Sequence, residues 1–307
     1  MHFECALCGS TQADVTVVKD AKSRAPLEIA SCLDCGLVQH RTLPSDASLK
    51  IYYSHNYRQD YKNTYSPKLK YVRRAGIAAN QRIATLKALV ELNGKQLLDI
   101  GAGGGEFVYL ASHNGLVATG IEPNEGYSEF AKKEYGVDIK TMMLDDVTSA
   151  SADVVSLFHV LEHMAKPKDV MAKLYEVLND GGHLFVEVPN ILQNDASPHN
   201  IYFKAHLFYY SRFTLISMAS KYFDPVAIFD QGNLLVLFKK KSSPLSHDVL
   251  PTQDDITHSQ QRMRQKGWGE YLLVGGGLTK PFKRFKQHLI ERRIDPAISP
   301  RTLLDNL

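Results

Sequence analysis

The chain has 307 residues and a mass of 34.4 kDa, with 44% hydrophobic residues, 22% charged residues and a formal net charge of +3. These values exclude a miniprotein, a disordered polymer and an integral membrane protein, and the length predicts about two domains. Apolar runs such as residues 234–238 fall far short of the ~20 residues that a membrane helix needs. The start Met-His-Phe-Glu-Cys has no signal-like pattern, so we expect a cytoplasmic protein.

Four cysteines form two Cys-x-x-Cys pairs near the start, Cys5 with Cys8 and Cys32 with Cys35. The 23 residues between the pairs let two tight turns present four thiolates to one tetrahedral ion, and zinc suits such a set. Four free thiols or two disulfides are the alternatives, and disulfides are disfavoured without a secretory signal. A site closed by four thiolates leaves no open coordination position, so we expect a structural zinc module over residues 1–45.

Residues 46–94 are expected to connect this module to the next domain. Five tyrosines in the segment either line a pocket or pack the connector against its neighbour: Tyr52, Tyr53, Tyr57, Tyr61 and Tyr65. Apolar residues recur at three-to-four spacing over residues 68–92 and predict one or two amphipathic helices that end near Asn93 and Gly94. Such helices should cover a sheet.

Short apolar runs alternate with helical patterns from residue 96 to residue 238. Strands are predicted over residues 96–100, 116–121, 153–158 and 183–188, and helices over residues 106–113, 125–135 and 168–178. This alternation is typical of an α/β, doubly wound parallel sheet, which binds ligands at the carboxyl ends of its strands. Runs at 225–229 and 234–238 flank a turn at 230–233, so the sheet should end in an antiparallel pair.

The first of these strands runs into a glycine-rich turn. The glycines follow the pattern G-x-G-x-G: Gly101, Gly103 and Gly105. Glu106 stands where a dinucleotide-binding loop has its third glycine, and a carboxylate there would repel a pyrophosphate. Asp99 precedes the turn and can attract the ammonium of an amino-acid moiety, while Glu122 ends the next strand and can accept hydrogen bonds from both ribose hydroxyls. S-adenosylmethionine has both groups, so it is the expected cofactor.

Four segments, 98–105, 120–123, 153–163 and 181–190, resemble the successive motifs of class I S-adenosylmethionine-dependent methyltransferases. The resemblance extends over about residues 70–240. The two cysteine pairs, with residues 35–38 and the pair Tyr52 and Tyr53, are also similar to a bacterial branch that has a zinc-binding module before the methyltransferase core. Several members of that branch are similar to enzymes of sugar and polysaccharide tailoring.

The resemblance implies a seven-stranded Rossmann-like methyltransferase sheet with an antiparallel last strand, here placed in residues 95–240. It places the adenine near residues 143–145 and the methionine end near Phe158 and His159. Taken with the glycine-rich turn, it gives the expected cofactor-binding residues: Asp99, Gly101, Gly103, Gly105, Glu122, Pro123, Leu144, Asp145, Phe158 and His159.

Histidines are the candidates for the acceptor side, because methylation of a hydroxyl requires a group that removes its proton. His159 and His163 follow the predicted strand 153–158, and His199 and His206 follow the predicted strand 183–188. The segment that begins at His206 resembles the acceptor-side segment of the branch, whose sugar C-methyltransferases have Tyr-x-Glu-His there. This chain has Ala205 in place of the glutamate, which favours an oxygen acceptor. His206 is the first candidate base and His163 the second.

These side chains also have structural interpretations. A histidine is more often a hydrogen-bonding group than a catalyst, Glu162 could only cap or orient its loop, and Glu187 could only fill the polar end of its strand.

The last segment, residues 241–307, is expected to be a Ser/Pro/Thr/Asp/Gln-rich linker to about residue 261 and then a basic tail. From Lys239 onward the chain has 13 Lys and Arg against 7 Asp and Glu. The basic cluster could bind the phosphates of an activated sugar, a membrane-surface headgroup or RNA, or be a solvated helix face: Lys283, Arg284, Lys286, Arg292 and Arg293.

The leading hypothesis is an S-adenosylmethionine-dependent methyltransferase that O-methylates a sugar, either nucleotide-linked or part of a surface glycan. An RNA methyltransferase is a weaker alternative, because residues 1–60 contain few Lys and Arg. A methyltransferase for another small molecule and a non-catalytic, cofactor-binding assembly protein are the remaining alternatives. The sequence does not predict an oligomeric state.

Overall fold

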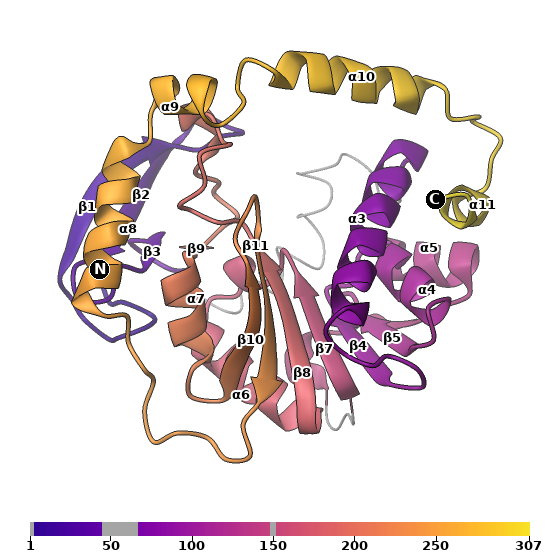
Figure 1. Ribbon diagram of the computed structural model, residues 1–307, viewed down its shortest axis with the longest axis horizontal. Coiled ribbons are helices and arrows are strands. Elements are labelled where there is room, and N and C mark those ends of the chain that lie inside the picture. Colours follow the sequence, from indigo (N-terminus) through magenta and orange to yellow (C-terminus); the bar gives the residue numbers. More distant parts are fainter. Residues whose placement is uncertain (1–2, 45–66, 148–151) are drawn as a thin grey trace. The chain divides into compact units, whose positions relative to one another are not determined.

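The computed structural model describes residues 3–44, 67–147 and 152–307 (Figure 1). The strands are β1 (Ala13–Lys19), β2 (Pro26–Cys32), β3 (Val38–His40), β4 (Gln96–Ile100), β5 (Val117–Ile121), β6 (Asp138–Lys140), β7 (Ala152–Phe158), β8 (Leu178–Val188), β9 (Phe208–Tyr209), β10 (Phe223–Phe229) and β11 (Leu234–Lys240). The helices are α3 (Leu69–Lys87), α4 (Glu106–Ser112), α5 (Glu125–Tyr135), α6 (Pro167–Val177), α7 (Arg212–Ala219), α8 (Gln253–Gln265), α9 (Trp268–Leu273), α10 (Lys280–Arg292) and α11 (Pro300–Asp305).

Seven strands form the main sheet in the order β10-β11-β8-β7-β4-β5-β6. β4 pairs in parallel with β5 and with β7, and β5 pairs in parallel with β6. β10 and β11 form the expected antiparallel hairpin. The predicted α/β sheet with an antiparallel end is therefore confirmed, and the short strand β6 is an addition that the apolar pattern did not reveal. Its three residues contain a single buried side chain, Ile139, which is too little for a periodic signal.

The helices that accompany β4 and β5 show why the sequence folds here as it does (Figure 1). α3 buries one stripe of small and branched side chains, with Val72, Ala79 and Ile83 among them. Gly76 belongs to the same stripe, and a Cβ atom there would lie 2.5 Å from Leu304 Cδ2. A helical glycine is unfavourable by itself, so its presence here is explained by the close approach of α11.

A second sheet has four strands in the order β1-β2-β3-β9. The first three strands come from the cysteine-containing segment, and Val38 and Gln39 of β3 pair antiparallel with Tyr209 and Phe208 of β9. The backbone N–H of His40 also donates to the carbonyl of Leu207 at 2.9 Å. The cysteine-containing segment is thus hydrogen-bonded to the segment that contains His206.

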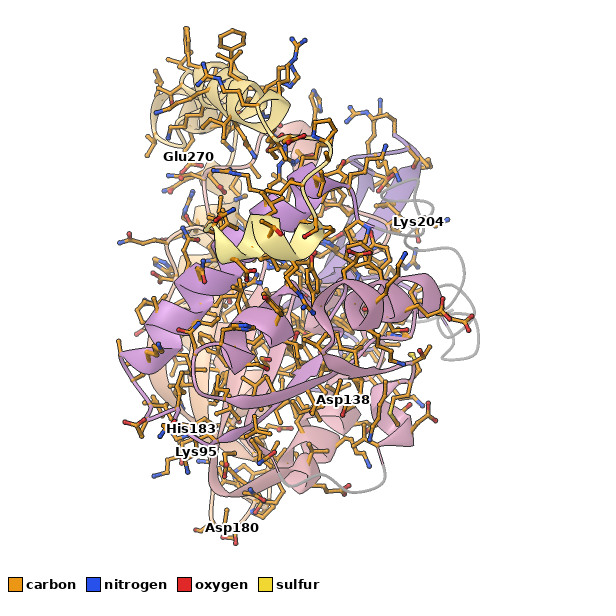
Figure 2. All side chains as sticks on the ribbon, turned by 90° about the vertical axis from the view of Figure 1, so that its right-hand side faces the viewer. Lys95, Asp138, Asp180, His183, Lys204 and Glu270 are labelled. Atoms are coloured by element: carbon orange, nitrogen blue, oxygen red, sulfur yellow. The ribbon has the colours of Figure 1, made fainter. Side chains whose placement is uncertain are left out.

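Two compact units are distinguished within the described residues. One comprises residues 3–44, 158–175 and 184–285, and it contains the four-stranded sheet. The other comprises residues 67–147, 152–157, 176–183 and 286–307, and it contains β4, β5 and the glycine-rich turn. Figure 2 marks Lys95 and Asp138, which stand at the amino ends of β4 and β6; the glycine-rich turn follows the opposite, carboxyl end of β4.

The carboxyl-terminal segment differs from the sequence prediction. The expected linker to about residue 261 contains most of α8, which begins with a capping box between Thr252 and Asp255. The prediction was wrong because Ser, Thr and Asp were taken as loop formers, whereas at a helix start they cap the first turn. The five tyrosines from Tyr52 to Tyr65 lie outside the described residues. None of the helices in the described ranges is both long enough and apolar enough to cross a bilayer.

Candidate functional site

The glycine-rich turn after β4 has the backbone conformation that only glycine adopts without strain. Gly101, Gly103 and Gly105 have φ angles of 71°, 57° and 84°. The N–H groups of Gly101 and Ala102 donate to the carbonyl of Ile121 at 2.8 and 2.9 Å, which holds the turn against the end of β5. A Cβ atom at Gly105 would lie 2.7 Å from Ala131 Cβ, so this glycine also allows close packing against α5.

Glu122 is buried and joins this turn to the start of α5. Its Oε2 accepts the N–H of Gly103 at 2.9 Å, and its Oε1 accepts the N–H of Asn124 at 3.0 Å. Asn124 in turn caps α5 by accepting the N–H of Tyr127. The ribose-binding role of Glu122 stays a prediction, and the structure shows that its carboxylate joins the glycine-rich turn to the start of α5.

Asp99 lies at the end of β4 and is 3% exposed. Burial raises the pKa of its carboxyl group to about 7, although a hydrogen bond from Ser156 and the charge of Arg82 oppose this rise. Ser156 Oγ donates to Asp99 Oδ1 at 2.6 Å, because β4 and β7 are paired with these two residues opposite each other. Sequence reasoning missed Ser156. A lone hydroxyl in the apolar strand 153–158 is the signal that could have identified it.

The other expected cofactor residues lie on three short segments. Pro123 is half-buried directly after Glu122. Leu144 is buried and Asp145 is exposed in the short 3-10 helix Leu144–Asp146. Phe158 ends β7 and contacts Phe185 edge to face, with the ring centroids 5.6 Å apart. Whether these residues touch the cofactor stays a prediction.

The segment after β7 begins with His159, whose φ of 57° is unusual for a residue with a side chain. Its N–H donates to the carbonyl of Glu187 at 2.8 Å, which fixes this backbone. The imidazole lies between two carboxylates, with Nε2 at 3.2 Å from Glu187 Oε1 and Nδ1 at 3.5 Å from Glu162 Oε1. Burial alone would lower the pKa of His159, but the two glutamates raise it to about 9, so we expect an imidazolium at neutral pH.

Glu162 is completely buried, with 0% of the residue exposed. Neither of its carboxylate oxygens accepts a hydrogen bond from any side chain or backbone group in the described ranges. Burial opposes ionisation, but the neighbouring His159, His163 and His206 lower its pKa below the usual range. Glu162 is therefore a buried carboxylate among three imidazoles, and its closest cationic neighbour is His159 Nδ1 at 3.5 Å.

His163 and His206, the two candidate bases, lie side by side. Their ring centroids are 4.9 Å apart in an edge-to-face arrangement. His163 Nδ1 donates to the carbonyl of Ala205 at 2.7 Å, and its Nε2 lies 4.0 Å from Glu162 Oε1. Burial and the neighbouring His163 lower the pKa of His206 to about 4, so it is a neutral imidazole. His199 is exposed, and its ring lies beside Arg24 and Trp268 instead.

The four cysteines converge as the spacing predicted. Sγ atoms of Cys5 and Cys35 are 3.4 Å apart, those of Cys8 and Cys32 are 3.5 Å apart, and all four lie within 4.8 Å of one another. A disulfide requires about 2.05 Å, so these are thiols. Sulfurs at the corners of a zinc tetrahedron with Zn–S bonds of about 2.3 Å lie about 3.8 Å apart. The cluster therefore has the dimensions of a four-thiolate metal site.

Comparisons with known proteins agree with this description. Residues 71–222 match the family model described as "Methyltransferase domain". A ubiquinone biosynthesis O-methyltransferase from Pseudomonas entomophila is 29% identical over 117 residues, and one from Marinobacter nauticus is 32% identical over 119 residues. Each match covers 36% of this chain and 50% of the relative. The chain thus spans about half the length of the curated relatives it matches.

Among solved structures, magnesium protoporphyrin IX methyltransferase from Synechocystis PCC 6803 with bound S-adenosylhomocysteine superposes with a TM-score of 0.51. It is 12% identical, and the match covers 64% of this chain and all of that protein. At this identity the likeness concerns the fold, and the fold is the seven-stranded arrangement described above. Residues 71–222 are therefore similar in sequence to a methyltransferase domain, and the main sheet has the fold of a solved methyltransferase.

Proposed function

We propose that this protein transfers the methyl group of S-adenosylmethionine to an oxygen of a small-molecule acceptor. The observation that carries the proposal is the pair of buried carboxylates beside the glycine-rich turn, Asp99 and Glu122. Asp99 suits the ammonium of the cofactor and Glu122 suits its ribose hydroxyls, because buried carboxylates form strong charge-assisted hydrogen bonds. The curated relatives are O-methyltransferases by name, which supports an oxygen as the acceptor atom.

The hydroxyl of the acceptor must lose its proton as the methyl group arrives. The cluster of His163, His206 and Glu162 is the proposed place for that step. His206 is the first candidate for the base that accepts the proton, and His163 is the second. A neutral imidazole can accept a proton, and the nearby carboxylate would stabilise the resulting cation. Ala205 supplies no carboxylate of its own, but Glu162 brings one to the same two histidines.

A sugar remains our proposed acceptor class, on the resemblance to the branch with a zinc-binding module. A hydroxyl on a quinone precursor is the second candidate, because the curated relatives are named for ubiquinone biosynthesis. Both candidates are small molecules, and both fit an oxygen acceptor. RNA is a weaker third.

The test is transfer of labelled methyl from S-adenosylmethionine to a panel of nucleotide sugars, hydroxylated quinone precursors and RNA. We expect the label in a methyl ether of one small-molecule class. Label on nitrogen or carbon would contradict O-methylation, and label on RNA would contradict the small-molecule acceptor. Asp99→Asn is the matched control, since it preserves the size of the side chain and removes the charge proposed to bind the cofactor.

We also propose that Cys5, Cys8, Cys32 and Cys35 bind one structural zinc ion. Hydrogen bonds among the sulfurs raise the pKa of Cys5 to about 12 and also raise that of Cys35, while they lower the pKa of Cys32. Four neighbouring thiolates would repel one another without a cation, whereas a divalent ion compensates their charge. The role is structural, because four protein ligands fill a tetrahedral zinc.

A further inference from the structure

A second cluster of metal-ligating side chains lies away from the cysteines, in the unit that contains β9. Glu162, His163 and His206 each offer one donor atom, and the three atoms lie within 4.8 Å of one another. Two of the residues are buried and His206 is half-buried. Two imidazoles and one carboxylate are the ligand set that zinc hydrolases and non-haem iron sites use, and that set leaves coordination positions open.

The two oxygens of Glu162 indicate that this cluster can hold a cation. A buried carboxyl group whose oxygens accept no hydrogen bond is costly, and protein interiors rarely keep one. Both oxygens of Glu162 are in that condition among the described residues, and the hydroxyl of Tyr210 is also buried without a partner there. His159 Nδ1 approaches one of these oxygens only to 3.5 Å, whereas a cation at the cluster would contact the carboxyl group directly.

The neighbouring contacts orient the histidines as ligands. His163 Nδ1 donates to the carbonyl of Ala205 at 2.7 Å, so Nε2 is the nitrogen directed toward Glu162. Such a second hydrogen bond from a ligating imidazole to a carbonyl is a usual feature of metal sites. His159 also approaches Glu162, at 3.5 Å, but it has a closer carboxylate partner in Glu187 at 3.2 Å. A cation at Glu162 would therefore leave His159 paired.

We propose that Glu162, His163 and His206 bind a divalent first-row metal ion whose open positions take the acceptor oxygen. This inference rests on the proposed O-methyl transfer for its role, but the binding of the ion does not. A metal ion lowers the pKa of a hydroxyl that it binds. The hydroxyl proton then leaves to solvent water, the oxygen forms a bond to the methyl carbon, and the carbon–sulfur bond breaks with its electron pair on sulfur. In this site His163 and His206 are ligands, and this role replaces that of a base; His206→Ala would lower turnover under either role.

The test is a cobalt(II) titration of the zinc-loaded, full-length protein without cofactor or acceptor. Cobalt does not displace zinc from thiolates readily, and its visible spectrum reports the ligands, because thiolates add charge-transfer absorption and imidazoles and carboxylates do not. We expect one further ion per chain with a spectrum free of thiolate charge transfer. Glu162→Gln should weaken this binding at least ~10-fold, and His206→Gln should do the same.

Glu187→Gln is the matched control, because Glu187 is a neighbouring buried carboxylate that contacts His159 and is not a member of the cluster. We expect Glu187→Gln to leave the cobalt affinity within about threefold of that of the wild type, because the variant removes a nearby charge and no ligand. The zinc content and the affinity for S-adenosylhomocysteine report whether each variant is folded. His206→Gln decides the question if Glu162→Gln fails to fold.

Absence of cobalt binding to the wild-type protein would overturn the proposal. Equal binding by the wild type and the two cluster variants would overturn it as well, and so would a spectrum dominated by thiolate charge transfer. Cobalt binding with no methyl transfer to any hydroxyl would preserve the metal site and refute the proposed function, so the two failures are distinguishable.

Discussion

Replacement of Glu122 by alanine tests whether one carboxylate both binds the cofactor and holds the glycine-rich turn. The variant loses the acceptor for the N–H groups of Gly103 and Asn124, which lie 2.9 and 3.0 Å from the two oxygens of a buried side chain. Each donor left unpaired in the interior costs about 1–3 kcal/mol. The sum is about 2–6 kcal/mol, an upper range because water can enter the cavity. That is a large share of the roughly 5–15 kcal/mol that stabilises a typical domain.

The effect on cofactor binding has a separate origin. Loss of a charge-assisted hydrogen bond to the ribose removes about 1.5–3 kcal/mol, which corresponds to a roughly 10- to 150-fold lower affinity. Calorimetry with S-adenosylhomocysteine measures this term, and thermal unfolding without ligand measures the first. Glu122→Gln should give intermediate values, because its amide has one oxygen for the two N–H donors and directs an NH₂ group at the other.

Glu125→Ala is the matched control, since it removes an exposed carboxylate from the first turn of the same helix, α5. We expect it to change neither the cofactor affinity nor the unfolding temperature appreciably. A Glu122→Ala variant that unfolds earlier but binds S-adenosylhomocysteine as tightly as the wild type would refute the ribose contact. A variant that binds more weakly with unchanged stability would refute the structural role of the two hydrogen bonds.

Three further predictions concern other groups. The pKa of Asp99 is raised to about 7 in the folded protein, so the stability of the cofactor-free protein should fall as pH rises from about 4 to 7. The affinity for S-adenosylhomocysteine should fall up to about tenfold for each pH unit below 7, because the protonated carboxyl group loses its charge. Asp99→Asn should show neither dependence. Elemental analysis should find one zinc ion bound by the four cysteines. Cys8→Ser should lose this ion and impair acceptor binding more than cofactor binding. An equal loss of acceptor binding and cofactor binding would contradict a separable zinc module. His206→Ala should lower turnover of a true acceptor at least ~100-fold with near-normal cofactor affinity, and normal turnover would exclude His206 from catalysis.

Local patterns in the sequence determined the strands, the glycine-rich turn and the cysteine pairs, because each of these depends on residues that are close together in the chain. The apolar runs placed β4, β5, β7, β10 and β11 to within a few residues. For β4, β7 and β11 the reason is that a strand buried in a sheet must be apolar along its own length. β10 is mostly exposed, and the turn at residues 230–233 helped to place it. The glycines after β4 were identified for the same kind of reason, since a turn with positive φ is a local requirement. The two cysteine pairs could be identified for the same reason, because each Cys-x-x-Cys pair lies within four residues and one ion would join the two pairs.

Tertiary structure alone decided the features that join distant segments. Ser156 contacts Asp99 only because the register of β4 and β7 places them opposite each other. The short strand β9 exists because β3 supplies its hydrogen-bond partners, and two residues hold no periodic signal of their own. Glu162 and His206 are separated by more than forty residues, and nothing in the sequence around either residue predicts that the two lie close together. Folding buries them beside His163, and among the carboxylates that the structure describes Glu162 is distinguished by two buried oxygens that accept no hydrogen bond.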